Sequence, residues 1–418
     1  MMNYNEIIIW IHSYQANGRR PSLNRMKALL EKLGNPQSQF PAVHIVGTNG
    51  KGSTTSFLQN ILTASGYKTG TFTSPYITRF NERISVNGIE ISDEDLITIS
   101  HEVKKIVEDQ LLLSQFGKAT EFELVTLLMF TYFAFVNPVE IAVIEAGIGG
   151  TYDSTNVFKA LAVICPSISF DHEETLGNTL SKIAEQKIGV LDSGVPFVFG
   201  EMTEPVRQLF YQEANILHAP TYELNKDFFI CSHKAKFNFS YLDLTISDIN
   251  LKMLGAHQQA NASLAVMTSL ILKPLYSKIN PSFIVRGLEK TQWIGRSEFI
   301  KPNLMIDGAH NEESIRKLIE MLKHNFSAKT IHILFAGLER KPLDNFLNLL
   351  SEFDLTVTSF DFYQARKLGD YPKVYKHVED YKDWVKQSND NSNNLYIVTG
   401  SLYFISEVRN WLINKEIQ

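Results

Sequence analysis

The chain has 418 residues, of which 44% are hydrophobic and 20% are charged, and its formal net charge is −5. This balance is typical of a globular protein, excludes collagen-like, low-complexity and wholly disordered architectures, and at this length favours two domains. The small acidic excess argues against a nucleic-acid groove or a polybasic membrane anchor, because both need clustered basic residues.

Apolar strands alternate with helices in the first half of the chain. Leucines and a methionine at helical spacing predict a helix over residues 23–33, which Gly34 ends. Short apolar runs predict buried strands over residues 42–46, 70–73, 140–145, 161–164 and 196–199. Further helices are predicted over residues 57–66, 93–113, 121–135 and 178–191. This alternation is typical of a mostly parallel sheet with helices on both faces.

The pattern changes after residue 226. Apolar and polar side chains alternate over residues 237–250, as they do in half-exposed antiparallel strands. Helices are predicted again over residues 256–272 and 281–289. Strands then alternate with helices to the end of the chain, over residues 303–307, 330–336, 354–360 and 394–399. The sequence therefore predicts an α/β protein with a domain boundary near residue 292.

A glycine-rich loop, GTNGKGST, follows the predicted strand 42–46 and precedes a helix. Glycines let backbone N–H groups turn toward one anion, and the helix N-terminus adds a positive dipole. The loop departs from GxxxxGK[ST], because Ile45 and Gly52 stand where that pattern has a glycine and a hydroxyl. We expect it to bind a nucleoside triphosphate, with Lys51 on the terminal phosphates. The candidate contacts are Gly47, Thr48, Asn49, Gly50, Lys51, Gly52 and Ser53.

Other segments in the same chain carry a resemblance to a known family. They are RPSLNRMKALLEKLGNPQ, TSPYITRFNERISVNG, IEAGIGGTYDSTN, ISFDHEETLGNTLSKIAEQKIGV, GAHQQANASLAV, WIGRSE, IDGAHN and VTGSLYF. With them the chain resembles the folylpolyglutamate synthase and dihydrofolate synthase family, within the Mur ligase superfamily. The resemblance implies a P-loop NTPase-like, ATP-binding central domain over residues 1–291. It also implies a smaller Rossmann-like α/β glutamate-ligase domain over residues 292–418.

Two candidate metal ligands stand at the ends of predicted strands. Glu145 ends the run 140–145, and His172 follows another predicted strand, SISFD. Open α/β sheets bind ligands at the carboxyl ends of their strands, where a buried carboxylate is favourable beside a cation. From the residues alone, His172 could equally cap a helix or lie in the core. The resemblance implies two Mg²⁺ ions, one held by Ser74 and Glu145 and the other shared by Glu145 and His172.

Lys187 follows on the predicted helix after His172. Taken alone, it is typical of a solvated surface lysine. The resemblance implies a lysine that carbon dioxide carbamylates, which turns a cation into an anionic oxygen ligand for the second metal ion. The segment here is EQKIG where the family has EKAG, so Gln186 replaces a glutamate. Lys51, His172 and Lys187 are thus the candidate catalytic residues.

The resemblance also implies contacts to the nucleotide and to a second substrate. Asn261 matches an adenine contact, and Arg296 and Asp307 match nucleotide contacts. His310 and Ser401, which follow predicted strands of the second domain, match positions associated with the incoming L-glutamate. From the residues alone, Arg296 could form an ordinary salt bridge and Ser401 could cap a helix.

The implied reaction is ATP-dependent amide formation. A folate carboxylate attacks the γ-phosphate of ATP, and the amino group of L-glutamate then attacks the acyl phosphate. The candidate folate-side residues are Phe122, Glu123, Tyr152, Asp153 and Ser154. Bifunctional members commonly read GGRLDATN where this chain reads GGTYDSTN, which favours glutamate addition to the γ-carboxyl of a reduced folate. The alternative is a dihydrofolate synthase, or a bifunctional enzyme, joining dihydropteroate and L-glutamate.

Other functions fit the sequence less well. A peptidoglycan Mur ligase normally carries a UDP-binding domain before the loop, and the 46 residues that precede Gly47 leave no room for one. A P-loop switch protein would need a guanine-reading motif such as NKxD, and none is in place. The cysteines, Cys165 and Cys231, cannot form a disulfide framework, which favours the cytoplasm. We expect small-molecule substrates, no nucleic-acid or membrane partner, and a monomer.

Overall fold

The computed structural model describes residues 2–15, 20–233, 236–339, 341, 343–388 and 393–416. The chain divides into two units, which are described separately. The first consists of Met1–Leu251 with Gln259–Thr291, and the second of Lys252–Gln258 with Gln292–Gln418. In the described parts of the chain, no helix combines the length and the apolar character needed to cross a membrane.

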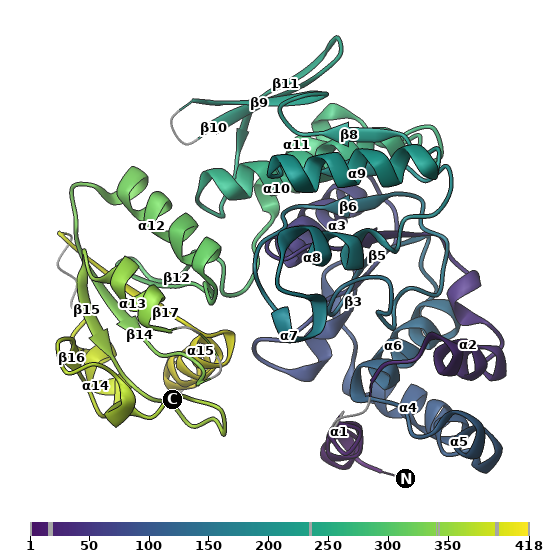
Figure 1. Cartoon of the computed structure of the whole chain (residues 1–418), viewed down its shortest axis with the longest axis horizontal. Helices are drawn as coiled ribbons and strands as arrows, with labels where there is room; N and C mark the ends of the chain where they lie inside the picture. The colour runs from purple at the N-terminus through teal and green to yellow at the C-terminus, as the bar shows by residue number, and fades with distance from the viewer. Residues whose placement is uncertain are drawn as a thin grey trace. The chain divides into compact units, whose positions relative to one another are not determined.

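An eight-stranded sheet forms the centre of the first unit (Figure 1). Its order is β4 (Ile89–Glu90), β3 (Ile84–Val86), β2 (Thr69–Phe72), β5 (Ile141–Glu145), β1 (Ala42–Ile45), β6 (Val163–Cys165), β7 (Phe197–Phe199) and β8 (Thr221–Glu223). The six neighbours β2, β5, β1, β6, β7 and β8 pair in parallel. Strands β3 and β4 add an antiparallel edge beside β2. The mostly parallel sheet is therefore confirmed. Strands β3, β4 and β8 were not predicted, because they have only two or three residues each.

Helices cover both faces of this sheet. They are α1 (Tyr4–His12), α2 (Leu23–Lys32), α3 (Lys51–Ala64), α4 (Asp93–Val107), α5 (Gln110–Phe116), α6 (Glu121–Thr131), α7 (Glu173–Leu176), α8 (Leu180–Ile188), α9 (Glu204–Ile216), α10 (Ala256–Leu272) and α11 (Pro281–Lys290), with short turns η1 (Pro36–Ser38), η2 (Phe80–Arg83) and η3 (Tyr132–Val136). Ala142 and Ile144 of β5 pack in one apolar cluster with α4 and α6. Val143, which points the other way, is equally buried, and α3 contacts β2 and β5.

Two predicted helices differ from the observed ones. One helix was predicted over residues 93–113, and the structure has two. Helix α4 ends at Val107, and α5 begins where the Asp109 side chain accepts the N–H of Leu112. A side-chain cap of this kind outweighs continued apolar periodicity. The prediction over residues 121–135 is α6 followed by the π-helical turn η3.

A separate antiparallel sheet follows β8, as the alternating sequence predicts (Figure 1). Its order is β11 (Leu244–Asn250), β10 (Lys236–Tyr241) and β9 (Phe228–His233). Phe237, Phe239, Ile246 and Ile249 are buried, while their neighbours along the strands are more exposed. The alternation of apolar and polar residues in the sequence therefore corresponds to one buried face of this sheet.

A six-stranded sheet forms the second unit. Its order is β12 (Glu298–Lys301), β13 (Leu304–Ile306), β17 (Asn394–Thr399), β14 (Thr330–Phe335), β15 (Asp354–Val357) and β16 (Lys376–His377), and only β12 is antiparallel. One face packs against α12 (Glu312–Phe326) and α13 (Leu343–Leu350). The other packs against α14 (Tyr381–Lys386) and α15 (Leu402–Glu416), and η4 (Leu368–Asp370) lies in a connection. The predicted Rossmann-like α/β arrangement is confirmed.

A buried ion pair ties α2 to α6 in the first unit. Arg25 Nη2 lies 2.7 Å from Glu123 Oε2, and the Arg25 Nε–H donates to the same carboxylate. Glu123, which is 0% exposed, also accepts the backbone N–H groups of Ser22 and Thr120. Buried charges of this kind are tolerated only when they are paired and hydrogen-bonded.

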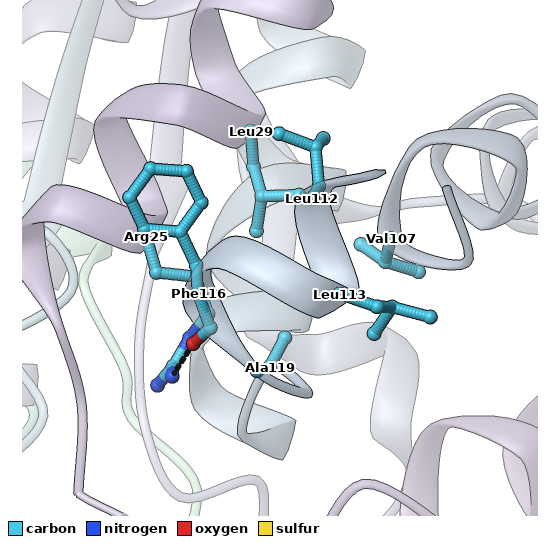
Figure 2. Close-up of a pocket in the computed structure, with 8 residues that line it drawn as sticks. Arg25, Leu29, Val107, Leu112, Leu113, Phe116 and Ala119 are labelled. Atoms are coloured by element: carbon cyan, nitrogen blue, oxygen red, sulfur yellow. Dashed lines mark hydrogen bonds between the residues drawn. The ribbon is translucent and has the colours of Figure 1, made fainter. Parts of the chain in front are cut away.

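The same arginine borders a pocket that is otherwise apolar. Figure 2 shows its guanidinium donating to the carbonyl oxygen of Phe116, at 3.0 Å. The other lining residues come from α2, α4, α5 and the turn that follows, namely Leu29, Val107, Leu112, Leu113, Phe116, Gly117 and Ala119. Water is thus largely replaced by protein groups around this cation.

Replacing Arg25 by methionine should destabilise the first unit, because the Glu123 carboxylate would stay buried without its cation. We expect the free energy of unfolding to fall by roughly 3–5 kcal/mol. Urea denaturation followed by circular dichroism measures the change. The double variant Arg25→Met/Glu123→Gln should regain part of the loss, since no charge is then buried. An Arg25→Met protein as stable as the unaltered one would contradict this account.

Candidate active site

The phosphate-loop candidate connects β1 to α3. Gly47 has a φ of 134° and Gly50 a φ of 86°, values in the left-handed region that favours glycine. Gly50 is the N-cap of α3, so the N–H groups of the first turn are directed out of the helix end. A Cβ atom at Gly50 would lie 2.5 Å from Asn261 Oδ1. The fold therefore brings Asn261, from α10, against the loop.

The segment after β6 holds the loop in place. The Thr48 N–H donates to the carbonyl oxygen of Ser167, and the Thr48 hydroxyl exchanges hydrogen bonds with the backbone N–H and carbonyl of Ser169. The Asn49 N–H donates to Ser167 Oγ, and the Asn49 amide donates to Ser169 Oγ. Protein groups thus use the N–H groups of Thr48 and Asn49, which leaves the start of α3 to face an anion.

Ser167 and Ser169 were not among the predicted site residues. Their position in the sequence could have indicated them, because they follow the predicted strand 161–164 just as the glycine-rich loop follows the predicted strand 42–46. Strands β1 and β6 pair in parallel, so the residues after each come to the same sheet edge.

Two lysines converge on the carbonyl oxygen of Gly47. Lys51 Nζ donates to it at 3.1 Å, and Lys187 Nζ donates at 2.7 Å. Lys187, near the end of α8, is only 4% exposed, so it is not the solvated lysine that its sequence alone suggests. Burial, with the nearby charge of Lys51, lowers the pKa of Lys187 to about 7.

The candidate metal ligands lie around the same edge of the sheet. Glu145 is the last residue of β5, is 4% exposed, and has Oε1 3.8 Å from Lys51 Nζ. Ser74 follows β2, which pairs in parallel with β5. These two oxygen donors fit the ligand preference of Mg²⁺. Among the described residues, however, no group of three or more His, Cys, Asp and Glu side chains is gathered as a metal site.

His172 lies at the N-terminus of α7 with a φ of 53°. Its side chain is 39% exposed, and its Nε2 atom is 4.0 Å from Asp171 Oδ2. The core position that the residues alone allowed is therefore wrong. The histidine is in the loop that also contains Ser167 and Ser169, so the contacts of Thr48 and Asn49 extend to the segment that bears it.

The predicted folate-side residues separate into two kinds. Phe122 lies against the backbone after β5, because a Cβ at Gly147 would be 2.6 Å from its ring. Tyr152, further along the same loop, is 67% exposed. Glu123 instead has its carboxylate engaged by Arg25, as described above. Tyr152 thus presents an exposed ring, Phe122 packs against Phe72 and this loop, and the Glu123 carboxylate is held by Arg25.

Asp153 and Ser154 are buried within that loop. Asp153 Oδ2 accepts the N–H of Ile148, and Oδ1 accepts the N–H and the hydroxyl of Thr155. Burial raises the pKa of Asp153, and these hydrogen bonds oppose the shift. Asp153 therefore shapes the loop from inside.

In the second unit, three of the four candidate residues lie at one sheet edge. Asp307 and His310 follow β13 and Ser401 follows β17, and these strands pair in parallel. Asp307 accepts the N–H groups of Ser297 and Ala309. Burial raises its pKa, against the lowering effect of the Arg296 charge. The assignment of these residues to one site with Lys51 stays a prediction.

Local contacts surround Arg296, His310 and Ser401. A Cβ at Gly308 would overlap the guanidinium of Arg296, so the arginine lies directly over this glycine. His310 Nδ1 donates to the carbonyl oxygen of Gly308 at 2.8 Å. Ser401 Oγ accepts the N–H of Tyr403 at the start of α15, which is the capping contact that the sequence left open.

No family model matches the chain. It is 38% identical over 425 residues to a Bacillus subtilis protein named dihydrofolate synthase/folylpolyglutamate synthase, covering 97% of this chain and 98% of that one. It is 32% identical to the folylpolyglutamate synthase of Lacticaseibacillus casei, covering 99% of each. The apo structure of L. casei FPGS matches with a TM-score of 0.87 at 31% identity, over 99% of this chain and 100% of that one. The Mycobacterium tuberculosis folylpolyglutamate synthase with ADP matches with 0.89 at 26% identity, over 98% of each chain.

A side chain at Gly50 should impair nucleotide binding. In Gly50→Ala the new Cβ would press on Asn261 Oδ1 and deform the start of α3, so we expect the affinity for ATP to fall about tenfold or more. Calorimetric titration with a non-hydrolysable ATP analogue measures it.

Gly66→Ala is the matched control, because Gly66 also has a positive φ, of 82°, but its nearest neighbour is 4.0 Å away. Both variants should lose about 1–2 kcal/mol of stability from backbone strain. Equal nucleotide affinity in the two variants would remove Gly50 from the site.

Proposed function

The chain belongs to the folylpolyglutamate synthase and dihydrofolate synthase family, and we propose that it ligates L-glutamate to the γ-carboxyl of a reduced folate with hydrolysis of ATP to ADP. The observation that carries the proposal is the convergence of Lys51, Lys187 and Glu145 at the end of β1 and β5. A glycine-rich helix N-terminus with buried charges of both signs suits a polyphosphate and its counter-ions.

In the proposed reaction the residues of the loop bind and orient the triphosphate. Lys51 supplies a positive charge to its terminal phosphates, and the N-terminus of α3 supplies backbone N–H groups. The folate carboxylate then attacks the γ-phosphate, and L-glutamate displaces phosphate from the acyl phosphate. Asn261 lies close enough to the loop to orient the nucleotide. Arg296, Asp307, His310 and Ser401 would serve the nucleotide and L-glutamate from the second unit.

We assign Mg²⁺ to the carboxyl edge of the first sheet. Ser74 and Glu145 would hold one ion, and Glu145, His172 and Lys187 would hold a second. Bound Mg²⁺ neutralises the phosphate charge and polarises the bonds that react. An unmodified Lys187 would bring a second cation beside Lys51, which opposes metal binding.

A carbamate on Lys187 removes this conflict. With a pKa of about 7, a substantial fraction of the side chain is a neutral amine near pH 7, and the neutral amine is the form that adds carbon dioxide. The carbamate that results is an anion with two oxygen atoms. Burial therefore prepares the lysine for the modification that the family resemblance implies.

The second candidate activity is dihydrofolate synthesis from dihydropteroate and L-glutamate. The B. subtilis relative carries both names, and Phe122 lies beside the loop after β5, where an aromatic acceptor of either kind would stack. We propose a monomer in the cytoplasm for either activity. The two free cysteines, one buried and one exposed, fit a reducing compartment.

An ADP-release assay with L-glutamate decides between the two activities. Tetrahydrofolate and dihydropteroate are supplied in parallel, and reactions without L-glutamate correct for idle hydrolysis of ATP. We expect glutamate-dependent turnover with tetrahydrofolate to exceed that with dihydropteroate. Turnover with dihydropteroate alone would assign dihydrofolate synthesis, and turnover with neither would refute the ligase.

Lys187→Ala should lose most activity at saturating Mg²⁺, since the site loses its carbamate oxygens. Short carboxylic acids added to the assay should restore part of it. Lys187→Arg should stay inactive, because a guanidinium keeps its positive charge and does not accept carbon dioxide. Lys182→Ala, which removes an exposed lysine of the same helix, is the control. Full activity in Lys187→Arg would show that Lys187 is no metal ligand.

A further inference from the structure

The loop after β5 approaches the C-terminal end of α8 without room for side chains. A Cβ at Gly150 would overlap the carbonyl oxygen of Lys187, and a Cβ at Gly189 would overlap the hydroxyl of Thr151. Two glycines, one on each segment, therefore allow the backbones to meet directly. We call this contact the loop–helix dock, formed by Gly150, Thr151 and Asn156 on the loop and by Gln186, Lys187 and Gly189 on the helix end.

Thr151 supplies the central hydrogen bonds of the loop–helix dock. Its N–H donates to the carbonyl oxygen of Gln186 at 2.8 Å, and its hydroxyl donates to the same oxygen at 3.1 Å. Gln186 is in the last turn of α8, where carbonyl groups have no partner within the helix. The Asn156 amide then bridges the carbonyl oxygens of Thr151 and Gly189, at 3.2 Å each.

The dock joins two parts of the proposed site. Lys187 follows Gln186 directly, and its amine reaches the Gly47 carbonyl oxygen of the phosphate loop. On the other side, Thr151 is followed by the exposed ring of Tyr152 and the buried carboxylate of Asp153. A shift of the Thr151 side chain would therefore be felt both at Lys187 and in the folate-side loop.

We propose that Thr151 is a positioning residue that couples the folate-side loop to Lys187, and this inference rests on the proposed function. The β-branched side chain has few rotamers, so its hydroxyl is held on Gln186 at little entropic cost. The hydroxyl thereby fixes the position of the acceptor substrate relative to the reacting phosphate. Small displacements of such groups are costly to the rate, because the reacting atoms must be in near-attack geometry.

The test replaces Thr151 by valine, which keeps the shape and the backbone N–H but removes the hydroxyl. We expect kcat/KM for the folate acceptor to fall about fivefold or more, the factor for one lost hydrogen bond, with little change in the KM for ATP. Thr151→Ser keeps the hydroxyl and should restore most of the loss. Thr98→Val is the matched control, because it removes a hydroxyl that donates to the Glu94 carbonyl oxygen within α4. This variant should change neither kcat/KM for the folate acceptor nor the KM for ATP.

Hydrogen exchange supplies a readout that does not depend on activity. In Thr151→Val, amides of residues 147–156 and 183–189 should exchange faster together, while those of α4 should not. Unchanged exchange in the α8 segment, or kinetics of Thr151→Val that equal those of Thr98→Val, would overturn the coupling. Absence of ligation by the unaltered protein would instead refute the proposed function, and the exchange result would still report on the dock itself.

Discussion

The carbonyl oxygen of Gly47 is the acceptor on which the candidate site depends. It receives hydrogen bonds from Lys51 and Lys187, which come from helices more than a hundred residues apart in sequence. Two ammonium groups at one oxygen repel each other, and the buried carboxylate of Glu145 compensates for only one full charge. The remaining strain is relieved because burial favours the neutral form of Lys187. With Lys187 neutral, one positive charge on Lys51 faces one negative charge on Glu145.

Sheet topology explains why groups from separate segments meet there. Strands β2, β5, β1 and β6 are parallel neighbours, so the residues after them share one edge. Ser74, Gly47 and Ser167 follow their strands, and Glu145 is the last residue of β5. The second sheet repeats the principle, since β13 and β17 are parallel neighbours and are followed by Asp307 and Ser401. The positions of polar residues after apolar runs are therefore informative in both units.

Sequence patterns predicted the sheets well because buried parallel strands are almost wholly apolar, and the loop because its glycines are required by backbone geometry. They do not reveal contacts between residues that are distant in the sequence. Glu123 matched a folate-side position, yet its carboxylate pairs with Arg25, 98 residues away. Lys187 is typical of a solvated lysine by residue type, although Ile183, Ala184 and Ile188 place it on the buried face of its helix. A local contact can also escape the pattern, because the Asp109 cap interrupts a helix whose apolar periodicity continues. The contacts of Thr48 and Asn49 with a nucleotide stay a prediction, and the backbone N–H groups of these two residues donate to Ser167.

Those last contacts have a consequence for synthesis of the protein on the ribosome. The partners of Thr48 and Asn49 lie 118 to 121 positions later in the chain. A nascent chain that ends before Ser167 already contains β1 and α3, but it lacks the Ser167 and Ser169 contacts that hold Thr48 and Asn49. The nucleotide loop therefore matures only after β6 has emerged and docked beside β1. Cellular ATP can act as a folding ligand for this unit only from that moment onward, so the earlier intermediates must be stabilised by burial of the apolar core alone.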